Sequence, residues 1–202
     1  MPAPRMYVVA GPPGSGKSTF FSRESFEGAG YFNADDRAAQ ITGSYRGIPT
    51  SARAEVNKEF EQYVHSHIAH RASFAMETTL RGDITFQQAR MARKKGFRVH
   101  MRYVAVSEEE SLKRVANRAE GGGHAASEGT LRGIHRSSMK NLALALSERA
   151  IGVREAASAR SGTAAWQSAL HCRQGTAVAG ICPCWYTPRD WKTAGAIGSI
   201  LC

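Results

Sequence analysis

Residues 11–19 read GPPGSGKST and come directly after the apolar run MYVVA of residues 6–10. The spacing Gly-x-x-x-x-Gly-Lys-Ser between a predicted strand and a predicted helix is the Walker A pattern. Its glycines let the backbone wrap around phosphate oxygens, and the N–H groups of residues 14–18 converge at the positive end of a helix. Lys17 is expected to reach the β and γ phosphates of ATP, and the Ser18 hydroxyl to bind Mg²⁺. We therefore predict a nucleotide site formed by Gly11, Gly14, Ser15, Gly16, Lys17, Ser18 and Thr19.

Short apolar runs alternate with amphipathic stretches through residues 1–150. Gly96 is expected to take a left-handed conformation that ends one helix, and Ser107 with Glu110 to form a capping box that begins the next. The alternating order predicts an α/β fold of the P-loop kinase type, a parallel sheet with helices on both faces. Strands are predicted at residues 6–10, 31–33, 74–78 and 98–106, and helices from Lys17 and at residues 51–71, 83–95, 107–120 and 130–146.

The composition favours one domain and a polyanionic ligand. The length of 202 residues suffices for one sizeable core, so we expect a P-loop kinase domain at residues 1–150 and an atypical tail at residues 151–202. A formal net charge of +10 favours nucleotides, nucleotide-sugars or nucleic acid as partners. No stretch has the pattern of a signal peptide or a membrane span. All four cysteines lie in the tail without C-x-x-C spacing, which is typical of free thiols in the cytoplasm.

Two acidic residues follow the second predicted strand, in the stretch FNADD that contains Asn33, Asp35 and Asp36. The carboxyl edge of a parallel sheet is where open α/β folds bind their ligands. A phosphoryl transferase needs a carboxylate that takes the proton of the acceptor hydroxyl. We favour Asp35 as this base and place Asn33 and Asp36 at the acceptor. The two aspartates also suit the start of a helix, and the two roles are compatible.

A second polar segment, Glu77 to Arg81, ends the third predicted strand at the same edge. A glutamate followed by two hydroxyls is unusual at a buried strand end unless it meets something polar. We predict that Glu77, Thr78, Thr79 and Arg81 contact the acceptor and the water shell of the metal. The alternative is that these side chains cap the helix that starts near Asp83.

Arginines flank the glycine-rich stretch EGGGHAASEGT of residues 120–130. Arg114 and Arg118 suit the last turns of a helix, where cations stabilise the helix dipole. Glycine-rich segments with flanking arginines are also typical of a mobile lid, and arginines stabilise the charge of a phosphoryl group in transit. We predict that Arg118 and Arg132 are catalytic lid residues. His124 either binds the substrate or is an ordinary loop residue.

In combination, these residues resemble the zeta toxin family of P-loop kinases, in particular its chromosomal zeta-like members. Zeta toxins phosphorylate the 3'-hydroxyl of UDP-N-acetylglucosamine with ATP, and an antitoxin protein blocks their ATP site. The resemblance implies Lys17 and Ser18 on nucleotide and metal, Asp35 as general base, Glu77 and Thr79 near the acceptor, and Arg118 and Arg132 on phosphates. The matching stretches are residues 11–19, 32–35, 77–81, 114–118, 122–124 and 138–142.

Two stretches depart from the family pattern. Residues 131–136 read LRGIHR where the family has an Arg-rich helix start, so Gly133 removes a cation and weakens the helix by about 1 kcal/mol. After residue 150 the match stops, and all three tryptophans fall in the tail. A frameshifted ending or a divergent extension explains this tail. A frameshifted ending predicts that the fifth strand of the sheet is not formed.

Three functions fit these features. The leading prediction is an ATP-dependent kinase for a hydroxyl group of a small metabolite, with UDP-N-acetylglucosamine as the acceptor that the resemblance implies. A polynucleotide 5'-hydroxyl kinase also combines a P-loop with an aspartate base. Residues 1–150 lack interleaved aromatic and basic residues that bind bases, so nucleic acid is not the expected partner. The third function is a catalytically decayed ATP-binding module that only binds a partner.

Overall fold

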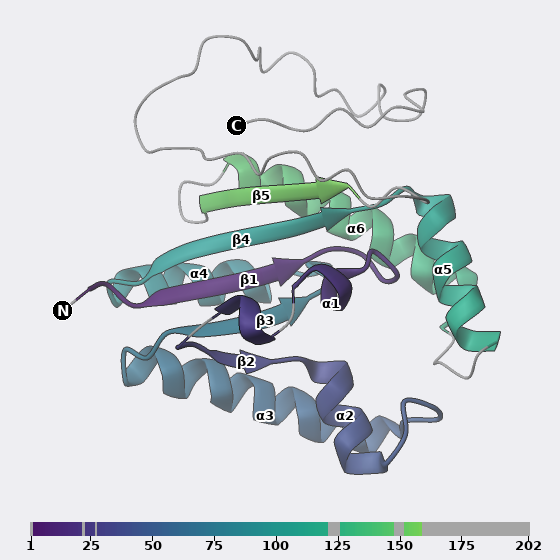
Figure 1. Cartoon of the computed structure of the whole chain (residues 1–202), viewed down its shortest axis with the longest axis horizontal. Helices are drawn as coiled ribbons and strands as arrows, with labels where there is room; N and C mark the ends of the chain where they lie inside the picture. Colours follow the sequence, from purple (N-terminus) through teal and green to yellow (C-terminus); the bar gives the residue numbers. More distant parts are fainter. Residues whose placement is uncertain (1, 22, 27, 121–125, 148–151, 159–202) are drawn as a thin grey trace, which may run out of the picture.

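The computed structural model describes residues 2–21, 23–26, 28–120, 126–147 and 152–158. These residues form one parallel sheet in the strand order β2-β3-β1-β4-β5 (Figure 1), which confirms the predicted α/β fold. The strands are β1 (Arg5–Ala10), β2 (Gly30–Phe32), β3 (Phe74–Thr78), β4 (Arg98–Ala105) and β5 (Gly152–Ser158). The helices are α1 (Lys17–Phe20), the 3₁₀ turn η1 (Arg23–Phe26), α2 (Ala34–Thr42), α3 (Thr50–Ala69), α4 (Ile84–Lys94), α5 (Glu108–Glu120) and α6 (Glu128–Ser147).

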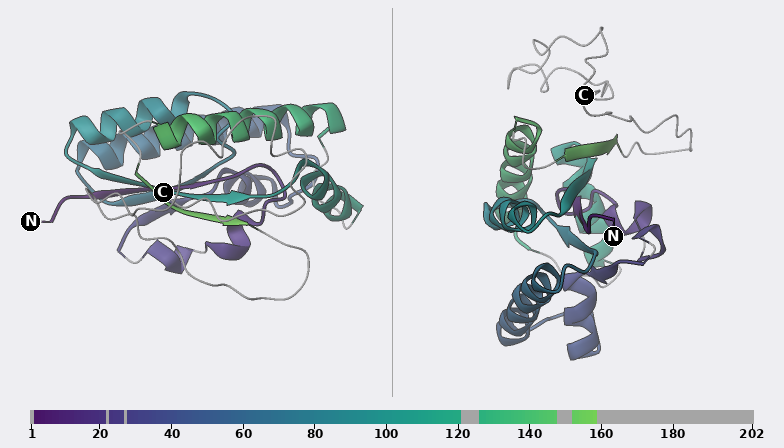
Figure 2. Two further views of the ribbon diagram at one scale, coloured as in Figure 1. Left: turned by 90° about the horizontal axis from the view of Figure 1, so that it is seen from above. Right: turned by 90° about the vertical axis from the view of Figure 1, so that its left-hand side faces the viewer.

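The two faces of the sheet are covered unequally. Figure 2 shows α3, α4 and α6 along one face and, among the described elements, the short α1 and η1 on the other. Met6, Val8 and Ala10 of β1 are buried in the larger core with side chains of the three long helices. Val9 points the other way and packs with Phe26 of η1. Because β1 is buried on both faces, its sequence is a continuous apolar run.

The predicted helix ends agree with the structure except at one cap. Gly96 follows α4 with φ of 83°, the left-handed conformation expected there. Ser107 Oγ accepts a hydrogen bond from the N–H of Glu110 at 3.2 Å and so caps α5. The Glu110 carboxylate, however, accepts from Arg114 Nε at 2.7 Å rather than reaching back to Ser107. Only the forward half of the predicted capping box is therefore formed, because a guanidinium one turn away competes for the carboxylate.

The sheet continues beyond residue 150. β5 pairs in parallel with β4 over residues 152–158, with a shift in register between Met101 and Arg102. The fifth strand, which a frameshifted ending would leave unformed, is thus present. Residues 159–202 lie outside the described residues, and so do the tryptophans, the cysteines and His124.

Candidate active site

The strand order places three polar segments next to the Walker A loop. Ala10, the last residue of β1, pairs with Thr78 of β3, and Phe32 of β2 pairs with Met76 of β3. Asn33 and Glu77 therefore lie side by side at the carboxyl edge, adjacent to the start of the loop. After β1 the chain continues to β2 and β3 on one side of β1, and after β3 it crosses to β4 on the other side. The carboxyl edge beside β1 is therefore the switch point where open α/β sheets bind ligands.

The loop is held closely between β4 and α5. A Cβ atom on Gly11 would lie 2.5 Å from the carbonyl oxygen of Val104, and one on Gly14 would lie 2.8 Å from that of Ser111. The buried Ser111 hydroxyl donates to the Pro13 carbonyl at 2.7 Å. Gly16, at the N-cap of α1, has φ of 89°. Larger residues at these glycines would clash or strain the backbone, so the loop conformation depends on them.

Lys17 is buried within the loop. Its Nζ donates to the carbonyls of Gly11 at 3.0 Å and Pro12 at 3.1 Å, and lies 3.7 Å from Glu77 Oε1. Burial lowers the pKa of Lys17, the charges of Glu77 and Asp35 oppose this shift, and the charge of Arg118 adds to it. Asp35 of α2 and Arg118 of α5 thus both act electrostatically on the Lys17 ammonium group.

Glu77 connects the loop to β2. Its Oε2 accepts hydrogen bonds from the Tyr31 hydroxyl at 3.2 Å and from Asn33 Nδ2 at 3.0 Å. Burial raises the pKa of Glu77, and the charge of Lys17 opposes that rise. Burial and the charge of Glu77 also raise the pKa of Tyr31, which keeps its hydroxyl a donor. The Glu77 carboxylate thus faces the phosphate loop rather than the N-terminus of α4.

Asn33 fixes the two aspartates in the first turn of α2. Its Oδ1 accepts from the N–H groups of Asp35 at 2.9 Å and Asp36 at 3.3 Å, while its Nδ2 binds Glu77. Asp36 Oδ1 accepts from the Tyr45 hydroxyl at 3.0 Å. Asp35 is exposed, and within the described residues its carboxylate makes no hydrogen bond to another side chain. Both aspartates lie in the first turn of α2, and one carboxylate oxygen of Asp36 is engaged by Tyr45.

The segment after β3 makes a strained turn. Leu80 is fully buried and has φ of 54°, a conformation that costs a residue other than glycine about 1–3 kcal/mol. Thr78 Oγ1 accepts from the Leu80 N–H at 3.1 Å, and Asn141 Nδ2 of α6 donates to the Leu80 carbonyl at 2.8 Å. These contacts hold the backbone on either side of the half-buried Thr79 and direct the chain toward the exposed Arg81.

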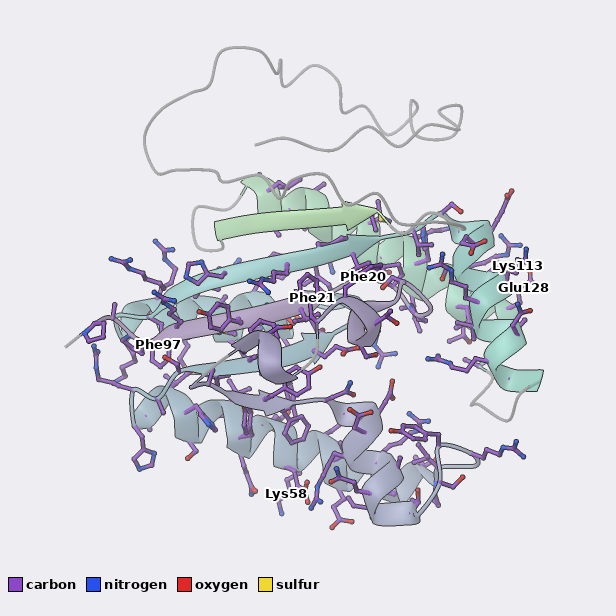
Figure 3. The ribbon with its side chains drawn as sticks, viewed as in Figure 1. Phe20, Phe21, Lys58, Phe97, Lys113 and Glu128 are labelled. Atoms are coloured by element: carbon purple, nitrogen blue, oxygen red, sulfur yellow. The ribbon has the colours of Figure 1, made fainter. Side chains whose placement is uncertain are left out.

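The two predicted lid arginines have different surroundings. Arg118 is exposed in the last turn of α5. Arg132 of α6 binds the carboxylates of Glu108 and Glu128, and Arg136 Nε lies 3.3 Å from Glu108. Burial would raise the pKa of Glu108, but the hydrogen bonds from Arg132 and Arg136 outweigh it and lower the pKa. Figure 3 shows Glu128 and Lys113 at the end of the molecule where α5 and α6 meet. Three of the five N–H groups of Arg132 are engaged by these carboxylates, so a phosphate would compete with them for this guanidinium.

The contacts of four residues of this site were not predicted from the sequence. Ser111 is a polar residue one helical turn before the buried Val115, so it faces the loop and binds Pro13. Such a polar residue on an otherwise apolar face is the signal that finds it. Tyr31 gave no local signal, because its partner Glu77 is distant in sequence. Asn141 lies in the matching stretch 138–142, but its contact with Leu80 was not predicted, because the two residues are 61 positions apart. Glu108 was likewise indistinguishable from its neighbours in the acidic first turn of α5.

Comparisons with known proteins identify the fold and the family of this chain. An uncharacterized protein of Haemophilus influenzae is 31% identical over 115 residues, which are 56% of this chain and 80% of that protein. A solved structure of the PezAT chromosomal toxin-antitoxin system of Streptococcus pneumoniae is similar with a TM-score of 0.60 and 15% identity, over 77% of this chain and 68% of that one.

A chain of the Pnkp1/Rnl/Hen1 RNA repair complex is similar with a TM-score of 0.57 and 18% identity. The match covers 71% of this chain and 47% of that one, so this chain spans about half of its length. At such identities the structural matches show a shared fold. The sequence model of the zeta toxin family matches residues 1–167, which include the whole described sheet and every candidate residue above. The chain belongs to the zeta toxin family.

Proposed function

We propose that the protein is an ATP-dependent phosphotransferase that phosphorylates a hydroxyl group of a small metabolite. The observation that carries this proposal is the 3.7 Å contact of Lys17 with Glu77 beside the glycine loop, with Asn33 binding both Glu77 and the backbone N–H of Asp35. The charges of Asp35 and Arg118 act on the same lysine. These residues supply a phosphate cradle, a candidate base and cations, which are the parts that phosphoryl transfer requires. The family makes UDP-N-acetylglucosamine the first acceptor to test.

Each residue has a defined task in this proposal. The loop N–H groups and Lys17 hold the β and γ phosphates, with Nζ exchanging the carbonyls of Gly11 and Pro12 for phosphate oxygens. Asp35 takes the proton of the acceptor hydroxyl while the oxygen of that hydroxyl bonds to the γ phosphorus. The bond from that phosphorus to the bridging oxygen breaks, and ADP leaves. Arg118 balances the charge of the phosphoryl group in transit.

The residues present also fit Mg²⁺ that arrives with ATP. Ser18 is exposed at the start of α1 and follows Lys17, whose Nζ lies 3.7 Å from Glu77 Oε1. In the part of the chain that the structure describes, no group of three or more His, Cys, Asp or Glu side chains could hold a metal by itself. Mg²⁺ usually keeps several waters and takes further oxygens from substrate phosphates, which suits this sparse donor set. Such an ion would supply charge neutralisation at the phosphates.

We further propose an antitoxin protein as a partner and the cytoplasm as the location. Membership of the family and the likeness to the PezAT system support the partner. Among the described helices, none has both the length and the apolar composition that crossing a bilayer requires.

A polynucleotide 5'-hydroxyl kinase is the second candidate. Two observations favour it, the likeness to a chain of an RNA repair complex and the net charge of +10. Both reactions use the same loop and base, so they differ only in the acceptor that fits beside Asp35. A decayed ATP-binding module is less well supported, because Lys17 lies 3.7 Å from Glu77 and Asn33 joins Glu77 to the Asp35 backbone.

Transfer from labelled ATP separates these functions. The protein is incubated with Mg²⁺ and either UDP-N-acetylglucosamine, a 5'-hydroxyl oligonucleotide or buffer, with Lys17→Ala as control. Label in the sugar nucleotide that Lys17→Ala abolishes supports the first proposal, and label in the oligonucleotide supports the second. ATP binding without transfer to any acceptor contradicts both and leaves the binding module.

A further inference from the structure

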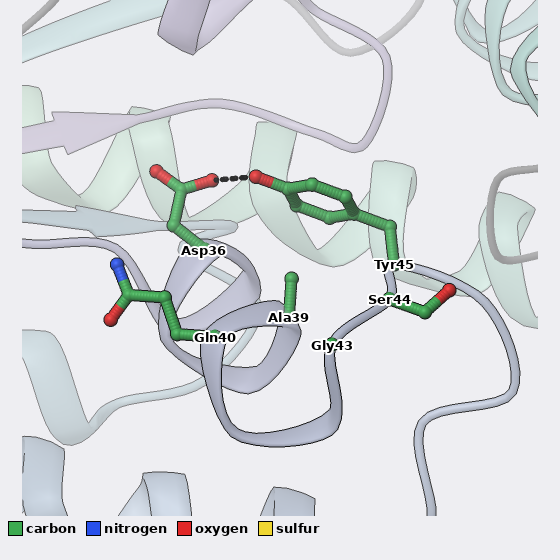
Figure 4. Close-up of a pocket in the computed structure, with 6 residues that line it drawn as sticks. All are labelled: Asp36, Ala39, Gln40, Gly43, Ser44 and Tyr45. Atoms are coloured by element: carbon green, nitrogen blue, oxygen red, sulfur yellow. Dashed lines mark hydrogen bonds between the residues drawn. The ribbon is translucent and has the colours of Figure 1, made fainter.

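A surface hollow of 460 Å³ borders the candidate active site. It lies between α2 and the loop after this helix and is lined by Asp36, Ala39, Gln40, Gly43, Ser44 and Tyr45 (Figure 4). Asp36 follows the proposed base Asp35 in the first turn of α2. The hollow therefore begins one residue away from the group that would take the acceptor's proton.

Tyr45 forms an aromatic wall of this hollow. Its side chain is 56% exposed, which is unusual for a large aromatic residue and leaves a ring face free for contact. The hydroxyl donates to Asp36 Oδ1 at 3.0 Å and so ties the loop to α2 (Figure 4). The flanking Gly43 and Gly47 have φ of 73° and 59°, and a Cβ at either would meet open space. The ring is thus held by one hydrogen bond on a loop with two glycine hinges.

Polar groups on α2 complete the lining. Gln40 Oε1 accepts from Arg37 Nη1 at 3.4 Å, and Asp36 Oδ1 is occupied by Tyr45. Within the described residues, Asp36 Oδ2 and Gln40 Nε2 make no hydrogen bond. One acceptor and one donor of the lining therefore remain for a ligand along the α2 side of the hollow. This combination matches a ring that carries hydroxyl or amide groups.

The described residues that line the hollow include one carboxylate, Asp36, and no lysine or arginine. Asp35 and Asp36 are adjacent carboxylates, and the neighbouring Arg37 guanidinium is bound by Glu59 at 2.6 Å. The hydrogen bond to Asp36 raises the pKa of Tyr45, and the Asp36 charge also acts on Glu77. Asp36 therefore belongs to both the hollow and the catalytic cluster. The Asp36 carboxylate thus favours a neutral ring over an anionic group against α2, while the exposed Arg46 follows Tyr45 in the sequence.

We propose that this hollow binds an uncharged, hydroxyl-bearing ring of the acceptor, which stacks on Tyr45 and hydrogen-bonds to Asp36 and Gln40. The inference rests on the proposed phosphotransferase function and adds to it a specificity-determining residue, Tyr45. In this arrangement the ring of the acceptor lies against α2, and any phosphate groups of the acceptor lie outside the hollow. A hydroxyl group on that ring would then lie beside Asp35.

Equilibrium binding to the full chain tests this inference without requiring turnover. The probes are N-acetylglucosamine, uridine and UDP-N-acetylglucosamine, added to protein saturated with a non-hydrolysable ATP analogue and Mg²⁺ and followed by saturation-transfer NMR and calorimetry. The two simple probes show whether the hollow takes a sugar ring or a nucleoside. Tyr45→Ala should weaken binding of the recognised ring about tenfold or more, as loss of aromatic stacking does.

Two further variants show whether the Tyr45 ring, the Tyr45 hydroxyl or a change elsewhere on α2 affects binding. Tyr45→Phe keeps the ring and loses only the tie to Asp36, so its affinity should lie between those of wild type and Tyr45→Ala. Ile41→Ala changes a 37% exposed side chain of the same helix outside the hollow and should bind like wild type. The affinity for the ATP analogue and the melting temperature should be unchanged in all three.

The inference is overturned if Tyr45→Ala binds the probes as tightly as wild type, or if wild type binds none of them. Failure of the kinase proposal has a different signature. A wild-type protein that binds a ring in a Tyr45-dependent way but transfers no label from ATP supports the hollow and refutes the phosphotransferase function.

Discussion

Asn33 illustrates how one side chain serves the backbone and the chemistry together. Its oxygen caps α2 and fixes the aspartates, while its nitrogen holds Glu77 beside Lys17. An asparagine amide is suited to this task because it accepts on one atom and donates on the other. Other capping residues such as serine satisfy the helix but cannot reach the glutamate.

Substitutions at Asn33 should separate the two roles. Asn33→Ala loses the cap and should lower the free energy of unfolding by about 1 kcal/mol, whereas Asn33→Ser keeps a capping oxygen and should stay near wild type. Both lose the donor to Glu77, so both should slow phosphoryl transfer to a similar degree. Denaturant unfolding and steady-state kinetics measure the two effects. Equal loss of stability in both variants would show that the cap is not the stabilising contact.

Among the secondary-structure elements, α6 supports the active-site edge through hydrogen bonds to β4 and to the turn that follows β3. Ser138 and Tyr103 share a buried hydrogen bond of 2.7 Å, and Asn141 reaches the carbonyl of the strained Leu80. The helix runs unbroken from Glu128 to Ser147 although Gly133 lies within it. Packing of its buried face therefore outweighs the low helix propensity of one glycine.

Loss of the Asn141 amide should loosen the turn at Leu80. Asn141→Ala leaves a partly buried carbonyl without its partner, at a cost of about 1–3 kcal/mol. It should also raise the KM for the acceptor more than the KM for ATP, because Thr79 and Arg81 follow from this turn. Lys140→Ala, at the exposed neighbouring position, serves as the control. Equal changes in both KM values would argue against a specific effect on the acceptor side.

The α5–α6 contact should depend on pH through Glu108. Because its pKa is lower in the folded protein, the ionised carboxylate stabilises the fold above its ordinary pKa of about 4.3, and this contribution is lost as the pH falls through the folded-state value. Glu108→Gln should therefore melt below wild type at pH 7, with a difference that narrows under acid conditions.

Thermal unfolding between pH 3 and 8 measures this difference. Glu109→Gln is the matched control, since Glu109 is exposed in the same turn. A difference between wild type and Glu108→Gln that stays constant across this pH range would exclude the carboxylate–arginine contacts as its source.

Local patterns predicted these elements better than they predicted side-chain partners. The Walker A spacing and the apolar runs depend on nearby residues, so the loop and β1 to β4 were found from the sequence. The strand order, which brings Asn33 to Glu77, depends on packing between distant segments. The same holds for Arg132, which was expected on phosphates and is bound to Glu108 and Glu128. Its catalytic role remains a prediction, in which a phosphate competes with these carboxylates for the guanidinium.

For the molecule as a whole, the extent of the kinase domain is the open structural question. The sheet includes β5 at residues 152–158, and the family match extends to residue 167. β5 covers the edge of β4, whose Met101, Tyr103 and Val104 are fully buried. An exposed edge next to such a core would invite pairing with other chains. We therefore propose that the domain reaches at least the end of β5.

Two truncations test this boundary. A chain that ends at residue 158 should unfold cooperatively, close to the melting temperature of the full chain. A chain that ends at residue 147 lacks β5 and should melt at lower temperature and aggregate more readily. Calorimetry and light scattering on both report the outcome. Equal stability of the shorter chain and the full chain would place the boundary before β5.

Single-turnover phosphoryl transfer at saturating ATP tests the central claim most directly, since it isolates the role of Asp35 beside the phosphate loop. Asp35→Asn should slow transfer to the accepted hydroxyl substrate by about 10²- to 10⁴-fold, with ATP affinity unchanged, as removal of a general base does. Asp36→Asn should keep most of the rate at saturating acceptor, because Asp36 is bound to Tyr45. Transfer by Asp35→Asn at the wild-type rate would contradict the account.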